Sequence, residues 1–171
     1  STSMDKSKRT TRELVYEGLI GCISKYGIEE ASVTRIAKMS GITRSLVSYY
    51  FPKKDQLFLE AIKYIAAQFQ NSSTQPVETT TKPISRLLER ISKNLVYFLN
   101  NESYFHCFNL FYYYAGIRNE YAQFNSEVSF IARREIRNDL EQAAKEEKRE
   151  LDNAAETTQI IHDVLVRTIQ R

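Results

Sequence analysis

The stretch ASVTRIAKMSGITRSLVSYYFPKKDQL, residues 31–57, decides the fold, because it contains the pattern of two short helices joined by a turn. Ser32 and Thr43 each precede an apolar periodic segment, where a hydroxyl can accept a hydrogen bond from a free N–H group in the first turn of a helix. Gly41 lies between the segments and suits the turn. Two short helices joined by three or four residues that include a glycine form a helix-turn-helix. The apolar residues expected to face inward are Val33, Ile36, Ala37, Leu46 and Val47.

The second short helix has a polar face. With its apolar residues buried, helical geometry turns four side chains outward: Arg44, Ser45, Ser48 and Tyr49. A guanidinium, two hydroxyls and a phenol can form hydrogen bonds with base edges or phosphates in a DNA major groove. An ordinary helical hairpin with a polar face fits the spacing equally well. The residues alone therefore leave both interpretations open.

The order of residues from Ala31 to Leu57 resembles the DNA-binding signature of TetR-family transcriptional regulators. The match includes the aromatic-Tyr-Phe run that ends at Phe51 and the Lys and Leu that follow it, and it covers about residues 8–70. Beyond residue 70, only the helical layout and the length resemble the family. The resemblance implies an all-α chain with an N-terminal three-helix DNA-binding domain at 1–54 and a helical effector-binding and dimerisation domain at 55–171, with a fourth helix at 53–70 connecting them.

The resemblance also implies a role for particular residues. The helix with the polar face would be the recognition helix, Tyr50 and Lys54 would contact phosphates, and Phe51 would fix the recognition helix to the next one. Lys54 has separate physical support, because it lies in the first turn after Pro52, where free N–H groups and the helix dipole favour an anion. Many family members carry Tyr at the place of Ser48, so their operator preference does not transfer. The DNA-binding set is Thr34, Arg35, Thr43, Arg44, Ser45, Ser48, Tyr49, Tyr50 and Lys54.

Charge is distributed unevenly along the chain. The net charge is +3, but residues 1–54 carry +5 and the remainder carries −2. A basic head favours a polyanionic partner for that part only, although chance variation in surface charge explains the figure about as well. The basic residues that precede or open the first helix fit phosphate contacts and a solvated arm equally well. They are Lys6, Lys8, Arg9 and Arg12.

Composition narrows the class of protein. The 171 residues are 42% hydrophobic and 26% charged, as expected for one or two globular domains. No run of 18 apolar residues is present, so we expect neither a transmembrane helix nor a membrane partner. Cys22 and Cys107 cannot form a disulfide framework, so the reducing cytoplasm is the expected compartment. Five glycines and three prolines favour helices over a many-turned β chain.

The body is expected to contain helices at about 84–100, 103–115, 120–149 and 154–170, after a loop at 71–83. Residues 104–114, YFHCFNLFYYY, hold seven of the twenty aromatic residues. A helix that is apolar on most sides is usually buried core. The family resemblance favours a pocket for a small-molecule effector instead. The residues that would line it are Phe69, Phe98, Tyr104, Phe105, His106, Phe108 and Tyr112.

No cofactor or metal is expected. His106 and Cys107 are adjacent and point to different sides of a helix, and His162 is distant in sequence, so no zinc spacing exists. The absence of a Gly-rich phosphate loop, a His-Glu-x-x-His motif and a nucleophile elbow argues against an enzyme. The resemblance implies a homodimer on a palindromic operator in double-stranded DNA, acting as a repressor that a small molecule releases. The alternative is a helical adaptor protein with a basic head and no specific DNA site.

Overall fold

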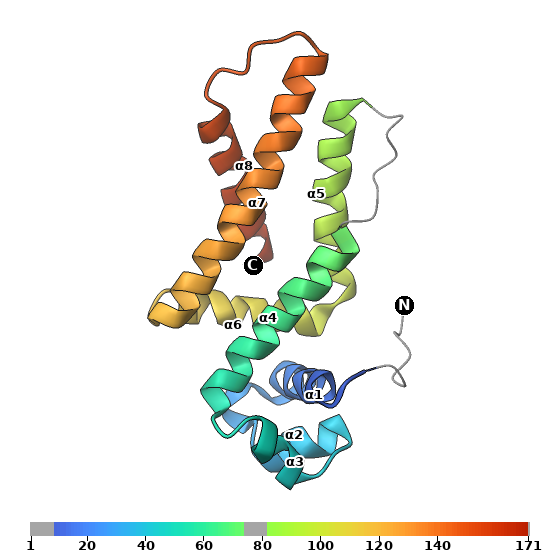
Figure 1. The fold of residues 1–171 in the computed structure, drawn as a ribbon, viewed down its shortest axis with the longest axis vertical. Coiled ribbons are helices and arrows are strands. Elements are labelled where there is room, and N and C mark those ends of the chain that lie inside the picture. Colours follow the sequence, from blue (N-terminus) through green and yellow to red (C-terminus); the bar gives the residue numbers. More distant parts are fainter. Residues whose placement is uncertain (1–8, 74–81, 171) are drawn as a thin grey trace. The chain divides into compact units, whose positions relative to one another are not determined.

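The computed structural model describes residues 9–73 and 82–170, and every regular element in those ranges is helical, which confirms the all-α prediction (Figure 1). One short 3-10 segment, η2, accompanies eight α-helices within these ranges. The elements are α1 (Thr11–Tyr26), η2 (Ile28–Glu30), α2 (Val33–Ser40), α3 (Arg44–Tyr50), α4 (Lys54–Ser73), α5 (Pro83–Asn100), α6 (Glu102–Ala115), α7 (Asn119–Glu146) and α8 (Ala154–Ile169).

The helix-turn-helix consists of α2 and α3, and local hydrogen bonds define its limits. Ser32 Oγ accepts a hydrogen bond from Arg35 N at 3.2 Å, and Thr43 Oγ1 accepts one from Leu46 N at 3.3 Å. Gly41 ends α2 in the left-handed region with φ of 70°, a conformation that is open to glycine at no steric cost. The predicted capping residues and the predicted turn are therefore confirmed.

The start of α4 lies one residue beyond the predicted start at residue 53. The helix begins at Lys54, and its first main-chain bond runs from Leu57 N to Lys53 O at 3.2 Å. The side chain of Phe51 is buried and its backbone is extended, with φ of −135°. A residue before proline disfavours the helical region. The chain therefore leaves α3 in an extended conformation and needs two further residues before α4 can begin.

The predicted loop at 71–83 is also shorter at both ends. α4 continues to Ser73 and α5 begins at Pro83. The centre of that loop, residues 74–81, and the basic residues Lys6 and Lys8 lie outside the described residues.

Close contact between α1 and α2 shapes the first part of the chain. A Cβ atom built on Gly18 of α1 would lie 1.9 Å from Ser40 Oγ and 3.0 Å from the backbone oxygen of Ile36. Glycine at this position therefore lets the two helices approach closely. The core beneath the crossing consists of Val15, Leu19, Cys22, Ile36, Ala37 and Val47, all nearly inaccessible to solvent.

The contacts between residues divide the chain into two compact units. The first consists of Ser1–Gln68 and Leu99–Phe111, and the second of Phe69–Phe98 and Tyr112–Arg171. α6 therefore contributes its first ten residues to one unit and its last four to the other. The functional division predicted at residue 54 is not tested by these contacts and stays a prediction.

The core of the second unit lies between α5, α7 and α8. α7 and α8 run in opposite directions along one another, and Arg90 of α5 forms an ion pair with Asp139 of α7 at 2.6 Å. No helix in the described ranges is long and apolar enough to cross a membrane. The core residues and the side chains packed on them are Leu87, Ile136, Leu140, Ile91, Leu151, Ile161 and Leu165.

Candidate nucleic-acid interface and pocket

The polar face of α3 is exposed, as the sequence predicts. Val47 is 1% exposed and holds the opposite face in the core. Tyr49 is 79% exposed, so its ring and hydroxyl are accessible on this face. The remaining exposed side chains of this face are Arg44, Ser45 and Ser48.

Aromatic contacts and one arginine fix the end of α3. The Phe51 ring is 7% exposed and lies 5.4 Å from the Tyr16 ring of α1, between centroids. The guanidinium of Arg12 lies 5.1 Å from the centroid of Tyr50 and 5.4 Å from that of Phe51. Such cation–π contacts hold positive charge beside α3. The structure thus places Phe51 as an anchor, while the phosphate contact of Tyr50 stays a prediction.

Arg35 already has partners within the chain. Its Nη1 donates to Glu30 Oε2 at 2.8 Å and to Glu30 O at 3.3 Å. Its guanidinium also lies 4.5 Å from the centroid of the Tyr26 ring. These contacts join η2 to α2, so a phosphate contact by Arg35 would compete with them. Thr34 beside it is exposed.

Lys54 also has a hydrogen-bond partner within the chain. Its Nζ donates a hydrogen bond to Ile28 O at 2.9 Å, which links the start of α4 to η2. An ammonium group has three donors, so two remain for an anion. Lys54 can therefore contact a phosphate while it keeps its hydrogen bond to Ile28 O, and the phosphate contact stays a prediction.

The first part of α6 packs within the first unit. Tyr104 and Tyr64 both donate hydrogen bonds to the Glu17 carboxylate of α1. Burial raises the pKa of both phenols, and the neighbouring carboxylate raises it further, so both stay protonated as donors. His106 Nδ1 lies 3.1 Å from Ser24 Oγ of α1. This part of the aromatic helix makes contacts between elements rather than lining a pocket of the second unit.

The predicted effector residues are divided between the two units. Phe69 and Phe98 stack at 5.2 Å in the second unit, where the Tyr97 ring meets both. Phe105 and Phe108 lie in the first unit with Tyr104 and His106. That these residues line one effector site therefore stays a prediction. Of that set, Tyr112 lines the pocket described next.

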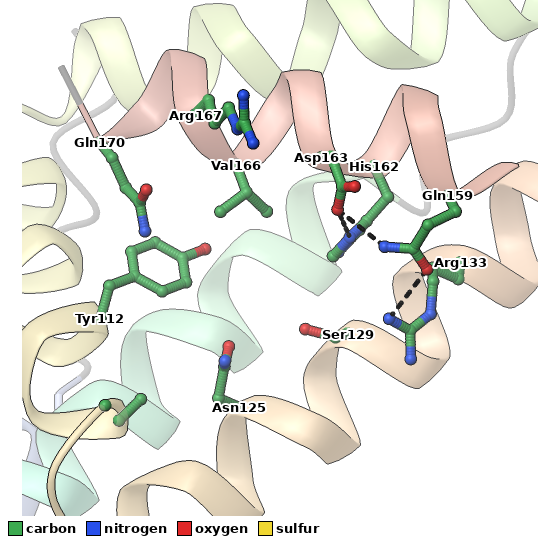
Figure 2. A pocket seen from close by; sticks show the side chains of 12 residues that line it. Tyr112, Asn125, Ser129, Arg133, Gln159, His162, Asp163, Val166, Arg167 and Gln170 are labelled. Carbon is green, nitrogen blue, oxygen red and sulfur yellow. Dashed lines mark hydrogen bonds and ion pairs between the residues drawn. The ribbon is translucent and has the colours of Figure 1, made fainter. Parts of the chain in front are cut away.

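A pocket of about 470 Å³ lies in the second unit between the end of α6, α7 and α8 (Figure 2). Most of its lining was missed by the sequence analysis, although the pattern was readable: polar residues recur every four positions at 125, 129 and 133 and again at 159, 163 and 167. A four-residue spacing keeps side chains on one face of a helix. The lining residues are Tyr112, Ala115, Gly116, Asn125, Ser129, Arg133, Gln159, His162, Asp163, Val166, Arg167 and Gln170.

The pocket contains a partly connected polar network. Gln159 Nε2 donates to Asp163 Oδ1 at 2.7 Å, and Arg133 Nη1 donates to Gln159 Oε1 at 3.5 Å. Desolvation lowers the pKa of His162, and the charge of Arg133 lowers it further. Burial raises the pKa of Tyr112 to about 12. Within the described residues, no cluster of His, Cys, Asp and Glu could hold a metal ion.

The comparison of sequences finds relatives for the N-terminal part. The family model described as bacterial regulatory proteins, tetR family, matches residues 17–61, which contain the helix-turn-helix. The HTH-type transcriptional regulator BetI of Yersinia pestis is 30% identical over 54 residues, which are 32% of this chain and 27% of that protein. The chain thus spans about a quarter of the length of this curated relative.

The comparison of structures extends over nearly the whole chain. A transcriptional regulator from Rhodococcus sp. RHA1 aligns with a TM-score of 0.74 at 20% identity, covering 94% of this chain and 80% of that one. FadR from Bacillus subtilis, solved with stearoyl-CoA, aligns with a TM-score of 0.76 at 16% identity, covering 92% and 84%. At these identities the alignments show a shared fold.

An all-helical fold that contains a helix-turn-helix with an exposed polar face is the architecture that helix-turn-helix regulators use. The relatives that match the N-terminal helices are named as regulators, in agreement with the expectation that the chain is not an enzyme. Residues 17–61 are therefore similar to the DNA-binding part of bacterial regulatory proteins of the tetR family.

Proposed function

We propose that the chain is a dimeric repressor that binds a palindromic operator in double-stranded DNA and is released by a small molecule. The observation that carries the proposal is the exposed face of α3, where Arg44, Ser45, Ser48 and Tyr49 stand on a helix fixed from behind by Val47 and Phe51. A rigid helix with protruding hydrogen-bond donors is what readout of base edges in the major groove requires. A bacterial DNA-binding regulator of this kind would act in the cytoplasm.

The apolar surface of α8 supports a homodimer. Ile160 and Val164, one helical turn apart, are each 58% exposed. Phe130 of α7 is 61% exposed. Large apolar side chains on neighbouring helices are a usual sign of an association surface. Two copies related by a two-fold axis would read half-sites about 34–36 Å apart.

The pocket and α6 support a response to a ligand. Tyr112 at the end of α6 lines the pocket, while Tyr104 earlier in the same helix donates a hydrogen bond to Glu17 of α1. A ligand that favours one placement of α6 would therefore bias the helix that also contacts the head. The shared fold with FadR, whose structure holds stearoyl-CoA, agrees with a ligand-responsive body.

The test is selection of bound sequences from random double-stranded DNA, followed by gel shift at about 50 and 200 mM salt. We expect a site with two-fold symmetry, a sequence-selective complex and steep loss of affinity with salt. Ile160→Glu combined with Val164→Glu should give a monomer by light scattering and lose cooperative binding to the full site. Binding without sequence preference would refute the proposal and favour an adaptor protein. A selected site without two-fold character would refute the dimer.

A further inference from the structure

The pocket in the second unit contains a buried polar atom without a hydrogen bond. His162 is 9% exposed, and its Nδ1 has no hydrogen-bond partner in the described part of the chain. The nearest acidic atom, Oδ1 of Asp163, lies at 4.0 Å, beyond hydrogen-bond distance. A buried polar group without a partner is costly, so native structures rarely keep one without a reason. Figure 2 shows this ring among the side chains that line the pocket.

The pocket also carries excess positive charge. Arg133 from α7 and Arg167 from α8 both line it, against the single carboxylate of Asp163. Arg167 forms no ion pair with a residue in the described ranges, and Arg133 has one long hydrogen bond, to Gln159. The Asp163 carboxylate is itself held by Gln159 Nε2 at 2.7 Å. Most donors of two guanidinium groups are therefore available in one concave site, which is the arrangement that recognises an oxyanion.

The rest of the lining favours hydroxyl groups on the ligand. Asn125, Ser129 and Gln170 present amides and a hydroxyl, whereas apolar contact is limited to Val166, Ala115 and the ring of Tyr112. The volume of about 470 Å³ is that of about sixteen molecules of liquid water. A small hydroxylated molecule fits this volume, but a long acyl chain would meet mainly polar groups.

We propose that this pocket binds a small hydroxylated oxyanion, of the class of sugar phosphates and hydroxycarboxylic acids, as the effector of the regulator. Arg133 and Arg167 bind the phosphate or carboxylate, and His162 Nδ1 forms a hydrogen bond with a ligand hydroxyl. The role of the ligand as an effector rests on the proposed function, whereas the binding of the ligand to the pocket does not.

The experiment measures ligand binding to the full chain by calorimetry and by thermal shift at about 0.15 M salt, which screens weak surface attraction. The probes are glucose 6-phosphate, glycerol 3-phosphate, gluconate and citrate. Glucose and glycerol are the uncharged controls, inorganic sulfate is the control for an anion without hydroxyls, and stearoyl-CoA represents a long acyl ligand. We expect at least one hydroxylated anion to bind and to raise the melting temperature, with its uncharged counterpart inactive.

Variants locate the binding. Arg133→Met and Arg167→Met should each weaken the active probe by about tenfold or more, since each removes a charge-assisted hydrogen bond. His162→Gln should weaken it less. Arg134→Met is the matched control, because Arg134 is exposed on α7 beside Arg133 and does not line the pocket.

Failure of the inference and failure of the proposed function give different results. Three results would overturn the inference. The first is that none of the hydroxylated anions binds, and the second is that the uncharged controls or sulfate bind equally well. The third is that Arg133→Met binds the active probe with unchanged affinity. Release of selected DNA by stearoyl-CoA alone also overturns it while sustaining the ligand-responsive repressor. Binding of a hydroxylated anion at Arg133 and Arg167 without any change in DNA affinity sustains the site and refutes its role as effector site.

Discussion

Substitution of Gly18 tests whether the close crossing of α1 and α2 depends on a glycine at this position. Gly21 in the same helix provides the matched control. A Cβ on Gly18 would lie 1.9 Å from Ser40 Oγ, 3.0 Å from Ser40 Cβ and 3.0 Å from the Ile36 backbone oxygen. Rotation of the serine relieves the first contact, but the other two require α2 to move. A Cβ on Gly21 would approach only the flexible end of Met39, at 3.0 Å.

The expected magnitudes follow from two opposing effects. Glycine to alanine inside a helix gains about 1 kcal/mol of helix propensity. Overpacking against rigid atoms costs about 1–3 kcal/mol. Gly21→Ala should therefore raise the free energy of unfolding by up to about 1 kcal/mol, because its only obstacle can move aside. Gly18→Ala should lower it by up to about 2 kcal/mol, since the steric cost exceeds the gain.

Thermal unfolding of the full chain, followed by helical circular dichroism, measures the difference. Each kcal/mol corresponds to about 2–4 °C in melting temperature for a chain of this size. The expected order of stability is Gly21→Ala, then the unsubstituted chain, then Gly18→Ala. Adding Ser40→Gly to Gly18→Ala should recover part of the loss, because it removes the serine atoms from the contact. Equal stability of the two alanine variants would refute the view that the α1–α2 crossing depends on Gly18.

Four further outcomes are expected. Arg44→Ala should cost about 1–3 kcal/mol of specific DNA binding and relax base preference at one position, and an unchanged selected site would contradict this. Lys54→Ala should weaken binding to all sequences and reduce the salt slope by about one, whereas an unaltered slope would remove it from the phosphate contacts. Tyr104→Phe keeps the ring but removes a hydrogen bond to Glu17, and should lower the free energy of unfolding by about 1–2 kcal/mol in thermal or urea unfolding. The pKa of His162 is lowered in the folded chain, so the unfolded chain binds a proton at this ring more readily. The contribution of His162 to the free energy of unfolding is therefore fully present above about pH 6.5 and is lost as the pH falls below that value. His162→Gln should flatten this decline, and a parallel decline in both proteins would show that other groups cause it.

Signals that act over a few residues could be predicted from the sequence. The capping bonds of Ser32 and Thr43 and the left-handed Gly41 depend on neighbours three or four positions away. The exposed face of α3 follows from helical period once Val47 is buried. The predicted start of α4 is one residue too early, because the buried Phe51 holds the chain extended before the helix. This burial depends on Tyr16 in another helix.

The pocket could not be predicted in the same way. Its arginines, Arg133 and Arg167, come from two helices separated in sequence, and the packing of α7 on α8 decides that they share a cavity. The family resemblance grouped the aromatic residues of α6 into one effector site. However, a helix that is aromatic on most sides can serve two neighbours, and here Tyr104 and Tyr112 belong to different units.

Because α6 contributes residues to both units, it can connect the pocket to α1 in the proposed response to a ligand. Tyr104 in its early part donates a hydrogen bond to Glu17 of α1, and Cys107, Phe108 and Phe111 of the same part are buried. Loss of a hydrogen bond to a charged group costs about 1–3 kcal/mol, because water replaces only part of it. The free energy of a hydrogen bond to a carboxylate is of the size typical of allosteric coupling, about 1–3 kcal/mol. Because coupling is reciprocal, a ligand in the pocket that reduces operator affinity by a given factor must itself bind the DNA-bound protein more weakly by the same factor.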